Sequence, residues 1–123
     1  MHINISSCLN SKVKEYLKLR DNKKYKNSKN KFTVEGVRSI HDVIENKVQI
    51  DRLFLTENCI KKISNTKYNL NDYSEICIIN EKIAKKMSLL KSNQGAFAVV
   101  KKPDNFKLEK IRKNRLQQFQ QII

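Results

Sequence analysis

Four short segments rich in β-branched and aromatic residues recur along this chain, and segments with helical spacing separate them. The strand-like segments are residues 32–35, 50–56, 74–79 and 95–100. Strands that alternate with short helices are typical of α/β proteins, because each helix packs back onto the sheet that its strand joins. The pattern predicts one α/β domain, a three-layer-like sandwich of a small mixed or parallel sheet with flanking helices.

The intervening segments predict helices over residues 8–20, 36–46, 57–63 and 81–90. Ser6 or Ser7 is expected to cap the first helix, and Asn80 the last. The apolar positions expected to face the core in the first helix are Leu9, Val13, Tyr16, Leu17 and Leu19. Those expected to face it in the other two long helices are Val37, Ile40, His41 and Ile44, followed by Ile83, Ala84, Met87 and Leu90.

The remaining segments divide the chain into three parts. Residues 21–31 have almost no apolar side chain except Tyr25 and predict a basic loop with at most one helical turn, so residues 1–31 form a basic amino-terminal helix and loop. Residues 32–103 form the α/β domain, with a polar connection at 64–72 and Pro103 at its edge. Residues 104–123 are a basic stretch whose last eight residues have the spacing of a final helix.

Positive charge is concentrated in two segments. The chain has 123 residues, 26 basic and 12 acidic, with a formal net charge of +14. Residues 11–31 and 101–115 together carry +12 of this charge, whereas the 69 residues between them carry +2. Because clustered basic residues usually face a polyanion, nucleic acid is the expected partner, and a merely solvated surface is the alternative.

Several other classes of protein are disfavoured. The longest apolar runs, 76–79 and 96–100, are far shorter than the roughly 20 residues that span a membrane, and no secretory signal precedes residue 10. Cys8, Cys59 and Cys77 lack the spacing of a zinc site, so no metal is expected, and their odd number favours a reducing cytoplasm. Cys59 and Cys77 are expected to be small buried hydrophobic residues.

No catalytic constellation is evident. The sequence lacks a nucleophile elbow, a phosphate-binding glycine loop and an HExxH motif. His41 lies on an apolar helical face, so a packed or partly buried structural histidine is expected rather than a catalytic one, and Asp42 and Glu45 fit an exposed helix face. Gly36 and Gly95 stand at junctions between a strand and a helix or loop, where a tight turn requires a permissive backbone.

Several short motifs together resemble a known family. Ile5-Ser6-Ser7 is followed by Asn10-x-x-Val13-Lys14, a basic stretch and then Phe32-x-Val34-Glu35-Gly36-x-Arg38. Asn93-Gln94-Gly95 later leads into Ala98-Val99-Val100-Lys101-Lys102-Pro103. The set is similar to the amino-terminal half of SpoU-family RNA ribose 2′-O-methyltransferases over residues 3–103. One departure is Ser11, where the family usually has proline.

The resemblance implies an RNA substrate-binding domain like the α/β sandwich of ribosomal proteins and kink-turn binders. Family members continue into a knotted domain that binds S-adenosylmethionine and transfers the methyl group, and its motifs are missing here. The resemblance therefore implies no catalytic residue and no cofactor on this chain, with residues 104–123 as the stub of a linker. It also implies a monomer, because family members dimerise mainly through the catalytic half.

The leading hypothesis is an RNA-binding domain that recognises structured ribosomal or transfer RNA without catalysis of its own. The residues expected to contact RNA are Lys12, Arg20, Lys23, Lys24, Tyr25, Lys26, Lys29 and Arg38. Glu35, Gly36, Gln94 and Gly95 are expected to have structural roles in the motifs. Tyr25 either stacks on an unpaired base or anchors the loop on the domain, and Arg38 either contacts RNA or pairs with Glu35 or Asp42.

Two alternatives remain open. The chain is either part of an active methyltransferase, as a truncated product or by pairing with a separate catalytic chain, or a protein-interaction module whose charge is inflated by biased codon usage. In the second case residues 116–123 would form a partner-binding helix.

Overall fold

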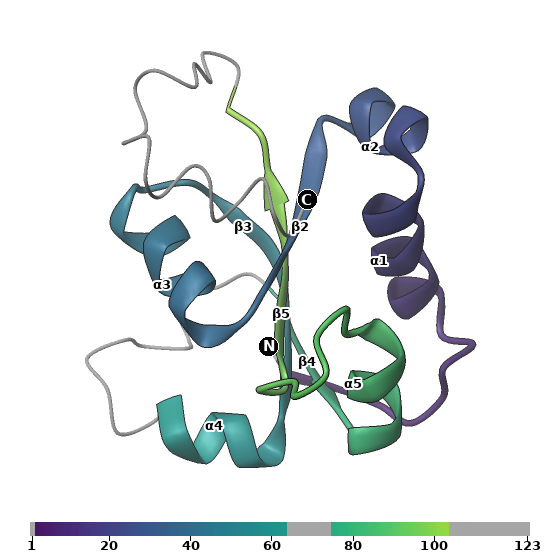
Figure 1. Cartoon of the computed structure of the whole chain (residues 1–123), viewed down its shortest axis with the longest axis vertical. Coiled ribbons are helices and arrows are strands. Elements are labelled where there is room, and N and C mark those ends of the chain that lie inside the picture. Colours follow the sequence, from purple (N-terminus) through teal and green to yellow (C-terminus); the bar gives the residue numbers. More distant parts are fainter. Residues whose placement is uncertain (1, 64–74, 104–123) are drawn as a thin grey trace.

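A five-stranded mixed sheet lies at the centre of the computed structural model, which describes residues 2–63 and 75–103 (Figure 1). In spatial order the strands are β1 (His2–Ile5), β4 (Ile76–Ile79), β3 (Ile50–Thr56), β5 (Ala96–Lys101) and β2 (Lys31–Glu35). β1, β4 and β3 are parallel, whereas β5 is antiparallel to both of its neighbours, β3 and β2. The predicted α/β fold with a mixed sheet is therefore confirmed.

Helices cover both faces of the sheet. α1 (Ser11–Asp21), α2 (Lys23–Lys29) and α5 (Glu81–Met87) lie on one side, and α3 (Val37–Glu45) and α4 (Glu57–Ile63) lie on the other (Figure 1). The buried residues accordingly form two clusters, one on each face. We call the layer of α1, α2 and α5 the α1–α5 layer. This arrangement is the three-layer sandwich that the alternating pattern predicts.

β5 explains why one predicted strand is apolar throughout. It is hydrogen-bonded on both sides and covered on both faces, so residues 96–100 are all buried. Alternate side chains enter opposite clusters: Ala98 packs beneath α3 and α4, and Phe97 packs beneath the α1–α5 layer. Because neither face of such a strand is exposed to solvent, polar and apolar residues need not alternate along it.

Tyr16 anchors the α1–α5 layer to the sheet. Its ring meets Phe54 of β3 and Phe97 of β5 edge-on, with centroid separations of 5.6 and 5.7 Å. The side chain is 1% exposed, and this burial raises the pKa of the phenol well above its ordinary value. Edge-to-face aromatic pairs add about 0.5–1.5 kcal/mol to the burial of the rings. Tyr16 thus fixes α1 against the middle of the sheet.

The start of the chain differs from the prediction. Residues 2–5 form β1, a strand that was not predicted, and the first helix begins at Ser11 rather than at residue 8. Asn10, not Ser6 or Ser7, caps this helix, because its Oδ1 accepts a hydrogen bond from the backbone N–H of Lys12 at 2.9 Å. Leu9 consequently lies in the preceding turn and is 73% exposed, so its predicted place in the core is wrong.

The segment expected to be a basic loop contains a two-turn helix, α2. None of its side chains is buried, so there is no apolar periodicity from which to predict it. Its boundaries are set by two asparagines. Asn22 Oδ1 accepts a hydrogen bond from the Tyr25 N–H, and Asn30 adopts the left-handed conformation that ends the helix.

Two further helical predictions need correction. In α3 the buried side chains include Ile40 and Val43, whereas Val37, its first residue, is 37% exposed. His41 is half-buried and lies 3.5 Å from Glu45, in agreement with the expected packed or partly buried structural histidine. α5 ends at Met87, so Leu90, which was predicted to lie on its apolar face, is instead 51% exposed. In both helices the pattern identified the helix but misplaced residues at its ends.

Cys59 and Cys77 are buried as predicted. The predicted connection at 64–72 and the predicted final helix lie outside the described residues. Within residues 2–63 and 75–103, no helix is long and apolar enough to cross a membrane.

Candidate nucleic-acid interface

α2 presents a dense group of lysines to solvent. Lys23, Lys24, Lys26 and Lys29 share this seven-residue helix, and none of them makes an ion pair within the described residues. Partial burial, together with the nearby charges of Lys23 and Lys102, lowers the pKa of the Lys26 ammonium. Binding of a polyanion would relieve this repulsion between positive charges. Because they make no ion pair within the described residues, the lysines of α2 that were predicted to contact RNA remain available for it.

Tyr25 packs on the domain rather than projecting from it. It is half-buried against the cluster beneath the α1–α5 layer. The ammonium nitrogens of Lys18 and Lys29 lie 4.2 and 5.6 Å from the centroid of its ring. These contacts favour the anchoring role for Tyr25, because a base that stacked on this face would have to displace Lys18.

Lys12 is engaged in an ion-pair network between α1 and the sheet. Its Nζ lies 2.8 Å from Glu75, and Glu75 also accepts a hydrogen bond from Arg52 Nε at 2.5 Å. Arg52 in turn contacts Glu15 of α1 at 3.2 Å. Burial raises the pKa of the Glu75 carboxyl, but the hydrogen bonds from Lys12 and Arg52 outweigh it, so the pKa is lowered. The geometry gives Lys12 a structural role, and RNA contact by Lys12 stays a prediction.

Arg20 joins α1 to α5. Its guanidinium forms a bidentate pair with Asp21 and donates to the carbonyl oxygen of Met87 at 2.8 Å. Met87 is the last residue of α5, whose final carbonyls lack intrahelical partners. The Arg20 side chain is 14% exposed, so its contacts are structural first, and RNA contact by Arg20 also stays a prediction.

Arg38 lies apart from the other predicted residues. It is exposed in the first turn of α3, in the helical layer on the opposite face of the sheet. It makes no ion pair with Glu35, Asp42 or any other described residue. The structure therefore brings together the lysines of α2 but places Arg38 on another surface.

Glu35 and Gln94 form a polar junction where β2 enters α3, which we call the Glu35 junction. The buried Glu35 carboxylate accepts hydrogen bonds from the Ser88 hydroxyl and from the Leu89 N–H. Gln94 Oε1 accepts a hydrogen bond from the Val37 N–H at 2.9 Å. The junction thus ties the segment 88–95 to the start of α3.

Both glycines at this junction have positive φ, +100° at Gly36 and +73° at Gly95. A Cβ at Gly95 would lie 2.3 Å from Thr56 Oγ1, whereas one at Gly36 would come no closer than 3.5 Å to Gln94. The turn role predicted for the two glycines therefore matches the backbone, and Gly95 also permits close packing of β3 against β5.

Three lysines of α5 were missed by the charge analysis. Lys82, Lys85 and Lys86 are all exposed, and none makes an ion pair within the part of the chain that the structure describes. They lie in the nearly neutral middle of the sequence, where local charge density gives no signal. α5 nevertheless packs beside α1 in the α1–α5 layer (Figure 1). The fold thus extends the basic surface from α2 to α5.

A mixed sheet with helices on both faces and basic residues concentrated in one layer defines a small α/β binding domain. A family model described as the MRM3-like substrate binding domain matches residues 10–98. The chain belongs to this family. No curated protein matches the sequence significantly.

Solved structures confirm the fold. An rRNA methyltransferase from Sinorhizobium meliloti matches 83% of this chain with 16% identity and a TM-score of 0.64. An RNA 2′-O ribose methyltransferase matches 86% with 20% identity and a TM-score of 0.63, and the SpoU methyltransferase AviRb from Streptomyces viridochromogenes matches 84% with 17% identity and a TM-score of 0.56. The match covers 38%, 39% and 37% of those three chains, respectively.

Proposed function

We propose that this chain binds structured ribosomal or transfer RNA as the substrate-binding domain of a ribose 2′-O-methyltransferase, and that the α1–α5 layer is the surface that contacts the RNA. The observation that carries the proposal is the group of exposed lysines on this layer without an ion pair in the described residues. It comprises Lys14 and Lys18 of α1, Lys23, Lys24 and Lys29 of α2, with the half-buried Lys26 between them, and Lys82, Lys85 and Lys86 of α5.

These lysines suit a phosphate backbone. Each ammonium that neutralises a phosphate releases condensed counterions, so the affinity falls as salt rises. α1 extends for about 16 Å between α2 and α5, which lie toward its two ends (Figure 1). An RNA that follows this layer meets lysines at both ends, while the ion-pair network beside α1 keeps the helix in place.

The test is a salt titration of binding to a transfer RNA and to heparin. We expect tighter binding to the RNA and a steep salt dependence for it. Equal affinity for RNA and heparin across the titration would contradict the proposal and favour the protein-interaction module instead.

We further propose that the chain alone is monomeric, cytoplasmic and inactive as a methyltransferase. The sequence lacks the cofactor motifs that the family resemblance implies for a methyl-transferring domain, and the matches cover 38% and 39% of two of the solved chains that it resembles. Incubation with labelled S-adenosylmethionine and RNA is expected to leave the RNA unlabelled. Methyl incorporation would show that the transfer site lies on this chain.

A further inference from the structure

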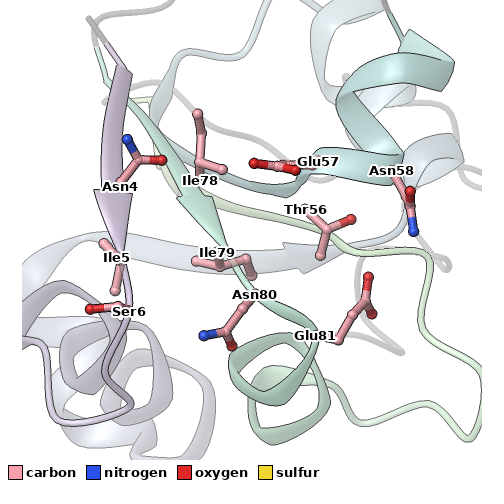
Figure 2. A pocket seen from close by; sticks show the side chains of 10 residues that line it. All are labelled: Asn4, Ile5, Ser6, Thr56, Glu57, Asn58, Ile78, Ile79, Asn80 and Glu81. Atoms are coloured by element: carbon pink, nitrogen blue, oxygen red, sulfur yellow. The ribbon is translucent and has the colours of Figure 1, made fainter.

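A pocket of about 470 Å³ with both polar and apolar lining residues opens where the parallel strands β1, β4 and β3 end (Figure 2). This volume falls within the roughly 300–1,000 Å³ of small-ligand pockets. β3 continues into α4 on one face of the sheet and β4 into α5 on the other, so the chain leaves these neighbouring strands in opposite directions. Ligands in open α/β sheets preferentially bind at such a switch point, beyond the carboxyl ends of the strands.

The pocket combines an apolar floor with hydrogen-bond acceptors. Ile5, Ile78 and Ile79 contribute the apolar part, and Glu57 and Glu81 approach from the first turns of α4 and α5 (Figure 2). Neither carboxylate has a hydrogen bond or ion pair within the described residues, and no basic residue lines the pocket. In a chain with a net charge of +14, this pocket is suited to a flat ligand that donates hydrogen bonds.

A basic groove continues from this pocket. Its volume is about 640 Å³, and Lys82, Lys85 and Lys86 line it from α5, opposite Ser7 and Cys8 of the turn that follows β1. Ser6 lines both the groove and the pocket, and Glu81 and Lys82 are adjacent in sequence, so the two hollows adjoin. An anion-binding groove therefore lies beside a pocket of hydrogen-bond acceptors.

We propose that the groove and pocket together bind one unpaired RNA nucleotide, with its phosphate on the α5 lysines and its base in the pocket. The proposal rests on the RNA-binding function above and assigns base recognition to it. Guanine fits best, because the N1–H and the exocyclic amine of its Watson–Crick edge present two adjacent donors to a carboxylate, whereas uracil presents one donor between two acceptors. The isoleucines supply an apolar surface for the face of the base.

A divalent cation fits the pocket less well. The described residues contain no group of three His, Cys, Asp or Glu side chains close enough to hold a metal ion. Two carboxylates beside an apolar floor favour an organic donor over a fully coordinated cation.

The first test measures base preference with two single-stranded oligonucleotides that differ only in one central nucleotide, guanosine or uridine. We expect the wild-type chain to prefer guanosine about fivefold or more, since one bidentate contact discriminates by at least this much. Glu57→Gln and Glu81→Gln should each reduce this ratio. Glu45→Gln on α3 removes the same charge from a residue that does not line the pocket and should leave the ratio unchanged.

The ratio separates base recognition from general electrostatics, because removal of a carboxylate anywhere strengthens binding to both oligonucleotides. A wild-type chain that binds both equally would overturn the proposal while leaving the RNA-binding function intact. Failure to bind either oligonucleotide or structured RNA would overturn both.

The second test uses Cys8 as a probe of the groove. Cys8 is partly exposed, whereas Cys59 and Cys77 are buried. Burial raises the pKa of the Cys77 thiol to about 11, and it also raises the pKa of the Cys59 thiol. A thiol reagent should therefore label Cys8 first, because the thiolate is the reactive form. The guanosine oligonucleotide at saturation should slow this labelling. An unchanged rate would place the RNA elsewhere and overturn the proposal.

Discussion

The Glu35 junction and the lysine surface of α2 lie at opposite ends of β2. They differ in whether their polar side chains have hydrogen-bond or ion-pair partners within the chain. At the junction, the Glu35 carboxylate accepts hydrogen bonds from a hydroxyl and a backbone N–H, and Gln94 Oε1 accepts one from a backbone N–H. On α2, four lysines lack an ion pair within the described residues and no side chain is buried. The first region holds the fold together, and the second is free to bind a partner.

The same distinction separates basic residues that are close in sequence. Lys12 and Arg20 both lie on α1, and each is held by a carboxylate. Lys14 is on the same helix but is exposed and makes no ion pair among the described residues. A high local charge density therefore combines residues that support the fold with residues that have no ion pair within the described residues, and only their partners distinguish the two groups.

The largest expected effect is loss of stability in Gly95→Ala. The new Cβ would clash with Thr56 at a backbone position of positive φ, which should cost about 3 kcal/mol or more. Gly36→Ala, where φ is also positive but space is available, should cost about half as much. Urea unfolding measures both. Equal losses would show that backbone strain, rather than close packing with Thr56, accounts for the effect at Gly95.

Glu35→Ala should be the next most damaging change. It removes a buried acceptor from the Ser88 hydroxyl and the Leu89 N–H, and the unpaired donors should cost about 2–3 kcal/mol. Chemical denaturation gives the stability change, and RNA binding by the folded fraction should remain unchanged. Impaired binding by fully folded Glu35→Ala would mean that the junction also contacts the ligand.

On α2, substitutions are expected to weaken RNA binding and to leave the stability unchanged. Replacement of Lys23, Lys24 and Lys26 by alanine should weaken RNA binding by on the order of tenfold and reduce the magnitude of the salt slope by about 2. Alanine favours helix, so stability should change little. Alanine at Lys61, Lys62 and Lys91, which lie outside the α1–α5 layer, is the control with the same charge change. If both triple variants bind equally, the location of the lysines does not matter and this surface is not the site.

The smallest effect concerns the ion-pair network beside α1. Because the folded pKa of Glu75 is depressed, its ion pairs stabilise the chain above the ordinary glutamate pKa, and this contribution is lost as the pH falls through the lower folded value. At near-neutral pH, Glu75→Gln should cost less than about 1 kcal/mol, since the pair is partly exposed. The difference in stability between the two proteins should shrink as the pH falls below the ordinary glutamate pKa and the Glu75 carboxylate is protonated. A difference that does not change on acidification would argue against this assignment.

Four of the five strands and most helices were predictable, because their buried residues follow the regular spacing of a strand or a helix. Phe97 and Ala98 on β5, or Ile83 and Met87 on α5, contribute to continuous buried surfaces that the local pattern reveals. α2 was not predictable in this way, since a helix without a buried side chain has no period to detect. The signals that did exist were its two asparagine caps, Asn22 and Asn30.

The candidate surface was only partly predictable. The lysines of α2 are adjacent in sequence and were identified from charge density. Lys82, Lys85 and Lys86 join the same layer only because β4 pairs with β1 and so brings α5 beside α1. The contact between Arg20 and the carbonyl of Met87 was equally unpredictable from the sequence, because the two residues are 67 positions apart along the chain.

The strand order also affects when this surface forms. β2 joins the sheet only through β5, so Lys31 pairs with Lys101 and Glu35 with Phe97. Long-range pairings of this kind form late in folding, because a long loop must first close. During synthesis, α2 therefore has no docked strand after it until the residues of β5 have been made. The α1–α5 layer is therefore complete only after β5 has been made and has paired with β2.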